Sequence, residues 1–117
     1  MSKQSLNDLT IRLREFAAAR DWEQFHSPKN LAMALAVEAS EIMEHFQWLT
    51  EEQSSGLPPK KLQQVKEEIA DVLIYLTRLA DRLGVDPLEA AYEKLEVNQA
   101  KYPADKVRGS AKKYTEL

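Results

Sequence analysis

The sequence predicts an all-α fold, a four-helix bundle that assembles into a homo-oligomer. Leu, Ala, Glu, Lys and Gln, which favour helix, dominate the 117 residues, and glycine occurs only three times. Apolar residues recur at intervals of three and four, the period of a helix with one buried face. The length predicts a single domain over residues 1–117.

The first two helices are separated by an irregular segment. The first is expected over residues 5–20, where apolar residues follow helical spacing. Residues 21–27 interrupt this pattern with two aromatic residues and a histidine. The second helix begins at Ser27 and Pro28, since serine is a good N-cap and proline fits the first turn, and it continues to Leu49.

A stretch rich in serine, glycine and proline separates the second helix from the third. The third helix is expected from Pro59 to Leu83, with Gly84 at the C′ position that ends many helices. The fourth begins at the N-cap Asp86 and stops before Pro103. The basic tail that follows, residues 104–117, has no sustained period.

Composition and charge exclude several classes of function. The chain has no cysteine, which removes disulfides, thiol catalysis and cysteine-based metal sites and fits a cytoplasmic protein. Its net charge of -3 gives no long-range attraction to nucleic acid. The longest apolar run, residues 31–37, is too short to cross a membrane, and the N-terminus lacks a signal core. The three glycines lie too far apart for a phosphate-binding loop. We therefore expect neither nucleic acid nor membrane as a partner.

One pair of acids lies on the second predicted helix. On a helical wheel Glu38 lies about 20° from Leu31, inside the apolar stripe, and Glu41 lies about 80° away at its edge. A carboxylate in a buried stripe is costly unless a partner compensates its charge. The pair is therefore either a structural ion pair at the edge of the stripe or part of a metal site.

A second pair lies on the third predicted helix. Glu68 and Asp71 are three residues apart and share a face, with Tyr75 on the same flank. Taken alone, this pair suits a solvated face. If the two helices pack antiparallel, however, the four carboxylates can converge. Carboxylate oxygens suit Mg²⁺ or Mn²⁺, and Mg²⁺ is commonly held by carboxylates together with substrate phosphates. The pattern therefore indicates a phosphate-bearing substrate.

These acids carry a resemblance to a known family. Glu38-Ala-Ser-Glu41 followed by Glu68-Ile-Ala-Asp71 resembles the E-x-x-E…E-x-x-D signature of the all-α MazG-like nucleotide pyrophosphohydrolases. Four further runs resemble the dCTP pyrophosphatase branch of that superfamily: Arg20-Asp-Trp-Glu-Gln-Phe-His26, Glu44-His-Phe-Gln-Trp48, Asp71-Val-Leu-Ile-Tyr75 and Arg108-Gly-Ser-Ala-Lys-Lys-Tyr-Thr-Glu-Leu117. The likeness covers nearly the whole chain.

The resemblance implies an activity. In such enzymes a nucleoside triphosphate and water give the monophosphate and pyrophosphate, which here implies dCTP or a modified dCTP and a role in nucleotide-pool sanitation. It implies that Mg²⁺ is bound by Glu38, Glu41, Glu68 and Asp71. Of these, we expect Glu41 and Glu38 to be the catalytic residues. Glu41 is the expected general base, and a metal-bound hydroxide is the alternative. Other functions remain open: a MazG-like enzyme with another or broader triphosphate preference, or a non-catalytic helical assembly module.

The resemblance also implies a pocket for the base. Positions matching residues 22–26, Trp48 and Tyr75 line the nucleotide site in that family. Trp22 and Trp48 are candidates for stacking on a base, whereas Phe25 is better explained by core packing. His26 either hydrogen-bonds the nucleotide or is a surface-loop histidine. Where the family can present a histidine to the base this chain has Leu13, so the choice among cytosine-type bases stays open.

The fourth predicted helix offers contacts to phosphate. Lys94, Asn98 and Lys101 share one face, which is either a solvated stripe or a phosphate-binding surface. The resemblance supports Lys94 and Asn98, together with Tyr102, as groups that reach the triphosphate.

The third predicted helix favours an oligomer. Its apolar residues cover an arc of roughly 220°, wider than a helix with one buried face needs. A symmetric homo-oligomer would bury that surface, and the resemblance implies a homotetramer, a dimer of dimers. The basic residues Arg108, Lys112 and Lys113 of the tail either close over phosphate, contact a neighbouring subunit or are disordered.

Overall fold

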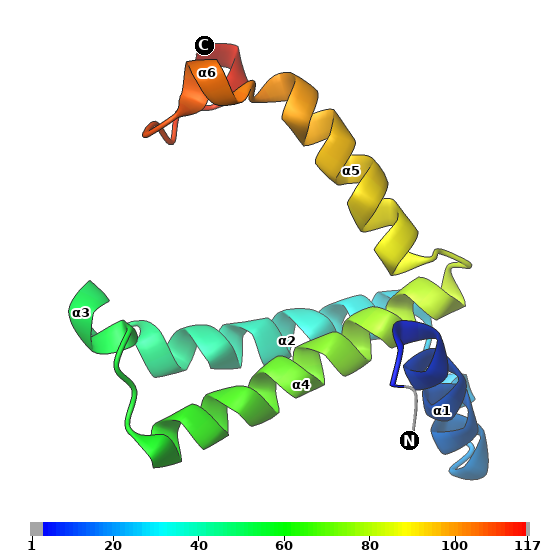
Figure 1. Cartoon of the computed structure of the whole chain (residues 1–117). Coiled ribbons are helices and arrows are strands. Elements are labelled where there is room, and N and C mark those ends of the chain that lie inside the picture. Colours follow the sequence, from blue (N-terminus) through cyan, green and yellow to red (C-terminus); the bar gives the residue numbers. More distant parts are fainter. Residues whose placement is uncertain (1–3, 117) are drawn as a thin grey trace. The chain divides into compact units, whose positions relative to one another are not determined.

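The computed structural model describes residues 4–116, and every regular element in that range is helical. The all-α prediction is therefore confirmed. Four long helices dominate (Figure 1): α1 (Leu6–Ala19), α2 (Pro28–Phe46), α4 (Pro59–Arg82) and α5 (Pro87–Lys101). Shorter elements are the 3-10 helix η1 (Glu23–Phe25), α3 (Glu51–Ser54), α6 (Ala104–Val107) and the 3-10 helix η2 (Tyr114–Glu116). The last residue of the tail run that resembles the family, 117, lies outside the described residues.

The chain divides into two units, Met1–Val85 and Asp86–Leu117. The first holds α1 to α4, and the second holds α5, α6 and η2. The single domain expected from the chain length stays a prediction. None of the helices in the described part of the chain is long and apolar enough to cross a membrane.

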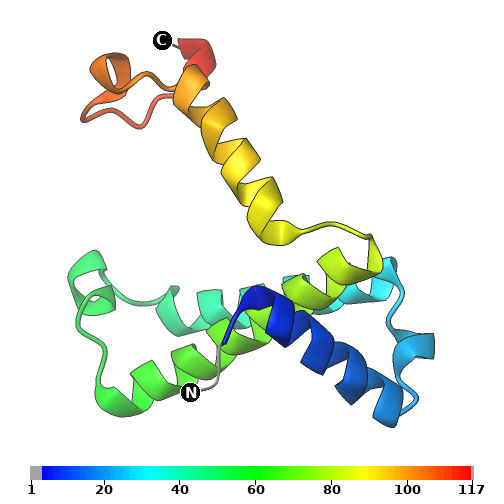
Figure 2. The ribbon, with the colours of Figure 1, turned by 45° about the vertical axis from the view of Figure 1, so that its right-hand side comes forward.

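In the first unit, α2 and α4 lie side by side along most of their lengths (Figures 1 and 2). They run in opposite directions, because α3 and a turn reverse the chain between them. This is the antiparallel arrangement on which the predicted convergence of acids depends. The helix α1 crosses α4 near the C-terminal half of α4.

The predicted helix ends are formed by the expected caps. The Ser27 hydroxyl accepts a hydrogen bond from the backbone N–H of Asn30 at 3.1 Å, which begins α2. The Asp86 carboxylate accepts from two backbone N–H groups in the first turn of α5. Gly84 has a φ of 69°, the left-handed conformation that ends α4.

Two short helices were not predicted. The α3 turn is stabilised by a capping box, in which Thr50 and Gln53 each bond the other's backbone N–H, at 3.1 Å and 2.9 Å. In the tail, α6 follows Pro103 and closes on a hydrogen bond from Arg108 N to Ala104 O of 3.1 Å. Both helices are too short to show a hydrophobic period, so the pattern could not reveal them. Within residues 104–116, regular structure is limited to α6 and η2.

The core of the described chain is thin. Its buried apolar residues are small or few: Ala17, Leu31, Val65 and Ala80. By contrast, α4 and its C-cap Leu83 leave several large apolar side chains exposed: Leu62, Ile69, Leu73, Leu76 and Leu83. Within the first unit, the wide apolar arc expected on this helix is therefore left partly uncovered.

Candidate functional site

The four predicted acids meet where α2 and α4 lie side by side. Glu38 and Glu41 lie on α2, Glu68 and Asp71 lie on α4, and all four side chains are half-buried. The pKa of Glu38 is raised, first by burial, then by a hydrogen bond to Glu41 and by the charges of Glu41, Asp71 and Glu68. The structure therefore brings together the four residues, which we call the acid cluster.

The chemistry of the acid cluster fits a hard divalent cation. Oε2 of Glu38 is buried and has no hydrogen-bond partner among the described residues. A buried carboxylate oxygen without a partner is costly, and three neighbouring acids add to that cost. As they stand, no three acidic or imidazole side chains of residues 4–116 are already spaced as the ligands of a metal ion. The fit therefore rests on donor chemistry and on the unsatisfied charge of Glu38.

A histidine on α2 contacts the acid cluster at Glu68. Nε2 of His45 lies 2.5 Å from Oε2 of Glu68, and Nζ of Lys61 lies 3.0 Å from Nδ1 of His45. An ammonium group only donates hydrogen bonds, so Nδ1 accepts from Lys61, and Nε2 is the ring nitrogen that faces Glu68. Because His45 follows Glu38 by seven residues, it lies on the same helix face. That spacing was the available signal, but nothing in the sequence pointed to Lys61.

The position of Trp22 is set by the end of α1. Asp21 has a φ of 54°, and the N–H of Trp22 donates to the carbonyl of Ala17 at 2.9 Å. This left-handed ending turns the chain back, so that the rings of Trp22 and Phe16 meet edge to face with centroids 5.6 Å apart. Trp22 is thereby held beside the helix while part of its surface stays exposed.

His26 is half-buried and is not a free surface-loop histidine. Its ring lies 6.4 Å from that of Trp22, centroid to centroid. Nδ1 of His26 accepts a hydrogen bond of 3.2 Å from Nε of Arg78, which lies on α4. Arg78 was not predicted from the sequence, where its only signal is a charge in the largely apolar stretch from Leu76 to Ala80.

The other predicted base-contacting residues differ in exposure. Phe25 is 59% exposed, so the core packing expected for it is wrong. Its backbone is nevertheless fixed, because its carbonyl accepts a 3.0 Å hydrogen bond from the Asn30 side chain. Trp48, just beyond α2, is 87% exposed and offers its ring for stacking. Tyr75 and Leu13 are half-buried, and Tyr75 lies one turn after Asp71 on α4.

The predicted triphosphate contacts lie in the second unit. Lys94 and Asn98 are exposed on α5, and Tyr102 caps this helix with its N–H bonded to the Asn98 carbonyl at 2.8 Å. Their role at the acid cluster stays a prediction. The tail residues Arg108, Lys112 and Lys113 are also exposed.

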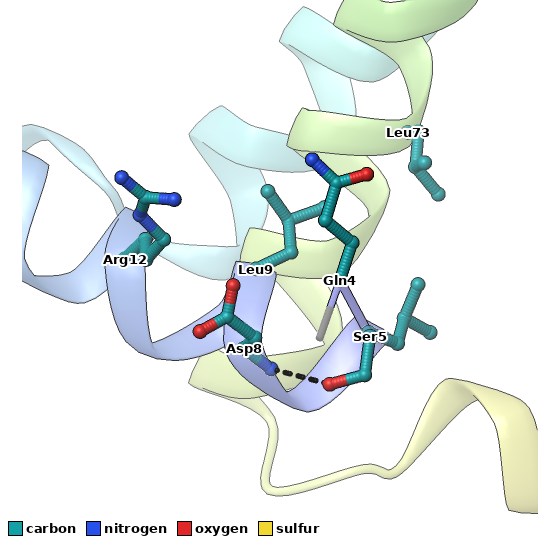
Figure 3. Close-up of a pocket in the computed structure, with 7 residues that line it drawn as sticks. Gln4, Ser5, Asp8, Leu9, Arg12 and Leu73 are labelled. Atoms are coloured by element: carbon teal, nitrogen blue, oxygen red, sulfur yellow. Dashed lines mark hydrogen bonds between the residues drawn. The ribbon is translucent and has the colours of Figure 1, made fainter. Parts of the chain in front are cut away.

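Two open cavities lie elsewhere in the first unit. One of about 440 Å³ lies between the start of α1 and Leu73 of α4 (Figure 3). Ser5 caps α1 at its edge, accepting from the Asp8 N–H at 3.0 Å. The other, of about 380 Å³, adjoins the connection between α2 and α4 and is lined in part by Leu57 and Lys61. Neither of these two cavities is lined by the acid cluster, which is identified by the chemistry of its carboxylates.

Known sequences resemble this chain over most of its length. The model of the MazG-like family matches residues 33–117, a range that contains the whole acid cluster. The dCTP pyrophosphatase 1 of Mus musculus is 48% identical over 115 residues, which cover 97% of this chain and 68% of the mouse protein. The human protein of the same name is 46% identical over 115 residues, with the same coverage of 97% and 68%.

A solved structure resembles the chain in fold. The crystal structure of a pyrophosphatase from Archaeoglobus fulgidus superposes with a TM-score of 0.80 and 39% sequence identity. The match covers 88% of this chain and 96% of the archaeal one. The all-helical architecture is therefore shared with a pyrophosphatase over most of both chains.

Proposed function

Because this chain belongs to the MazG-like family, we propose that it is a pyrophosphohydrolase that converts dCTP, or a modified dCTP, to the monophosphate and pyrophosphate. The observation that carries the proposal is the convergence of Glu38, Glu41, Glu68 and Asp71, together with the unpartnered buried oxygen of Glu38. Relatives named dCTP pyrophosphatase 1 at 48% and 46% identity support the same substrate. Such an activity would remove unwanted nucleotides from the pool, and we expect it in the cytoplasm.

The acid cluster is the proposed Mg²⁺ site. When bound, the ion would neutralise charge on the triphosphate and polarise its oxygens. The contribution of the chain is to hold the carboxylates on two packed helices. His45 and Lys61 keep Glu68 in place through the contacts described above.

The proposed reaction is attack of water on the α-phosphorus. The new bond joins the water oxygen to that phosphorus, and the bond to the bridging oxygen of the β-phosphate breaks. Pyrophosphate leaves with the electron pair, and the proton of water needs an acceptor. We assign Glu41 as that general base, because it lies at the edge of the apolar stripe, with Glu38 as the second catalytic acid.

The nucleotide contacts follow from the exposed aromatic rings. Trp22 and Trp48 would stack on the base, with Phe25 beside them. His26 and Tyr75 would make polar contacts, and Lys94, Asn98 and Tyr102 would contact the triphosphate.

A homo-oligomer is part of the proposal. The exposed apolar side chains of α4 form a surface that monomeric proteins rarely leave open to water. Closed symmetric assembly of identical chains buries such a face, and we propose a dimer of dimers. Sedimentation of the purified chain should give four times the mass of 13.4 kDa for one chain. A monomer at micromolar concentration would contradict this part.

A substrate panel tests the function. Pyrophosphate release is measured with dCTP, 5-methyl-dCTP, dUTP and dTTP, each with Mg²⁺ and with EDTA. We expect release from the two cytosine nucleotides only, and only with Mg²⁺. Equal release from all four would favour a MazG-like enzyme of broad preference. No hydrolysis of any triphosphate at any Mg²⁺ concentration would favour a non-catalytic assembly module.

A further inference from the structure

A network of charges lies apart from the acid cluster and centres on Arg78 of α4. Arg78 is only 4% exposed. Its Nε donates to Nδ1 of His26 at 3.2 Å, and its Nη1 donates to Oδ2 of Asp81 at 3.3 Å. Asp81 is held in turn by Arg14 of α1, through two hydrogen bonds of 2.8 Å and 2.5 Å. We call these residues, together with Glu23, the arginine cluster.

The buried position of Arg78 is not explained by stability alone, because removing its charge from water costs free energy. Its Nη2 is buried and makes no hydrogen bond to any described residue, with Oε1 of Glu23 4.0 Å away. A buried cation with an unsatisfied donor is commonly replaced by an apolar side chain without loss of stability. The hydrogen bond from Arg78 to His26 therefore points to a role other than packing.

The hydrogen bond from Arg78 decides the protonation of His26. A guanidinium group stays protonated and has no acceptor, so Nδ1 of His26 must accept with its lone pair. The neutral ring then carries its proton on Nε2. Adding a proton to Nδ1 would break this hydrogen bond and place a second positive charge beside Arg78.

The surroundings of His26 act in the same direction. Its pKa is lowered, first by burial and then by the charges of Arg78 and Arg82 on α4. Glu23 on η1 opposes this effect. The Trp22 ring, which meets the His26 ring in an edge-to-face arrangement, carries no charge.

We propose that Arg78 is a positioning residue of the nucleotide site, which holds His26 neutral and in the tautomer with its proton on Nε2. His26 then presents a hydrogen-bond donor, and it selects an acceptor on the nucleotide, such as a carbonyl oxygen or an unprotonated ring nitrogen. The contact with nucleotide rests on the proposed function, whereas the tautomer does not. Asp81 and Arg14 keep Arg78 in register with His26, because they link α1 to α4.

Nitrogen NMR tests the tautomer on the intact chain. The sequence has only two histidines, so a sample labelled with ¹⁵N at histidine gives two sets of ring signals. The set that disappears in His26→Gln belongs to His26. We expect an unprotonated Nδ1 and a protonated Nε2 in the wild type, and this state should persist below the ordinary pKa. A wild-type His26 with its proton on Nδ1 would overturn the proposal without any variant.

Two substitutions that each remove one positive charge separate the effect of the hydrogen bond to His26 from the effect of nearby charge. Arg78→Gln should mix the tautomers and raise the pKa of His26, because it removes both the hydrogen bond and a neighbouring positive charge. Arg82→Gln removes a neighbouring positive charge but not the hydrogen bond, so the tautomer should stay unchanged. Tautomers that are unchanged in Arg78→Gln, or mixed equally in both variants, would contradict the assignment.

Kinetics then test whether positioning matters for the substrate. Arg78→Gln should raise KM for dCTP about tenfold, the worth of one hydrogen bond, with kcat little changed. The acid limb of its kcat/KM profile should move to higher pH, and Arg78→Lys should restore part of the loss. A fall in kcat alone would contradict positioning. If wild-type protein hydrolyses no triphosphate, the proposed function fails, while the NMR result still decides the tautomer.

Discussion

The helix α4 carries two polar clusters about two turns apart, and they are built on opposite rules. The acid cluster gathers four groups of one sign, and Oε2 of Glu38 has no partner among the described residues. The arginine cluster alternates signs, with Asp81 between Arg14 and Arg78. The acid cluster gathers charge of one sign, as the proposed Mg²⁺ site requires, whereas the arginine cluster pairs opposite charges within the chain.

The two clusters therefore shift pKa values in opposite directions. The pKa of Glu38 is raised by burial and by its acidic neighbours. The pKa of Asp81 is lowered, chiefly by its hydrogen bond from Arg14. The difference teaches that the proposed metal site costs stability at Glu38, whereas in the arginine cluster the ion pairs of Asp81 contribute stability.

The largest effect is expected from breaking the acid cluster at Glu41. Glu41→Gln should lower kcat about a hundredfold to ten-thousandfold, the usual contribution of a general base, with little change in KM. Steady-state pyrophosphate release from dCTP measures this. The matched control is Glu44→Gln, an exposed acid on the same helix, which should keep wild-type rates. Near-normal turnover in Glu41→Gln would exclude Glu41 as the base.

The next largest effect is expected from substituting Asp81, which disrupts the arginine cluster. Asp81→Asn should lower the free energy of unfolding by about 2 kcal/mol at pH 7, since it weakens hydrogen bonds to two arginines. Because the folded pKa of Asp81 is lowered, its stabilisation is present above the unfolded value of 3.8 and is lost as pH falls through the folded pKa. Urea unfolding at pH 7 and at low pH measures both. A loss of the same size at the two pH values would contradict the ion pair.

A smaller effect of opposite sign is expected at Glu38. Glu38→Gln should raise the Tm of the metal-free protein by a few degrees, since it removes a repelled carboxylate. Wild-type stability should fall as pH rises from the ordinary value of 4.5 through the raised folded pKa, and the variant should lack this slope.

Magnesium provides the control for the Glu38 experiment. Mg²⁺ should raise the Tm of the wild type and have a weaker effect on Glu38→Gln. If metal-free Glu38→Gln melts below the wild type, the acid cluster is a stabilising ion-pair network and the contrast with the arginine cluster fails.

The smallest effect on stability is expected at Asp21, in the turn between α1 and η1. Asp21→Gly should stabilise the protein by about 0.5 kcal/mol, since glycine adopts a positive φ without the steric cost that aspartate bears. Thermal unfolding measures this. The control is Asp8→Gly in the first turn of α1, which should destabilise the protein because the backbone there is helical. A clear loss of stability in Asp21→Gly would show that the carboxylate itself holds the turn, through its contact with Gln24.

Two helix ends show how far the sequence predicts local structure. Gly84 and Asp21 both end helices in the left-handed conformation, with φ of 69° and 54°. Glycine is the most common residue at such an end, so the end of α4 was predicted. Aspartate is only an occasional occupant of this conformation, so the turn that positions Trp22 was not.

The two clusters show the same limit for the site. The acids were found because each pair repeats at helical spacing within one helix, and only the packing of the helices had to be assumed. Arg78 and His26 are 52 residues apart and share no pattern. Phe25 was misassigned because an apolar residue shows only that burial is favourable, whereas its exposure depends on what packs against it.

Hydrolysis of dCTP in ¹⁸O-labelled water tests the central claim most directly. With Mg²⁺ present, attack of water at the α-phosphorus predicts one heavy oxygen in the dCMP and none in the pyrophosphate, by mass spectrometry. EDTA should abolish both products. Label in the pyrophosphate, release of single phosphate, or turnover that EDTA leaves unchanged would contradict a Mg²⁺-dependent pyrophosphohydrolase built on the acid cluster.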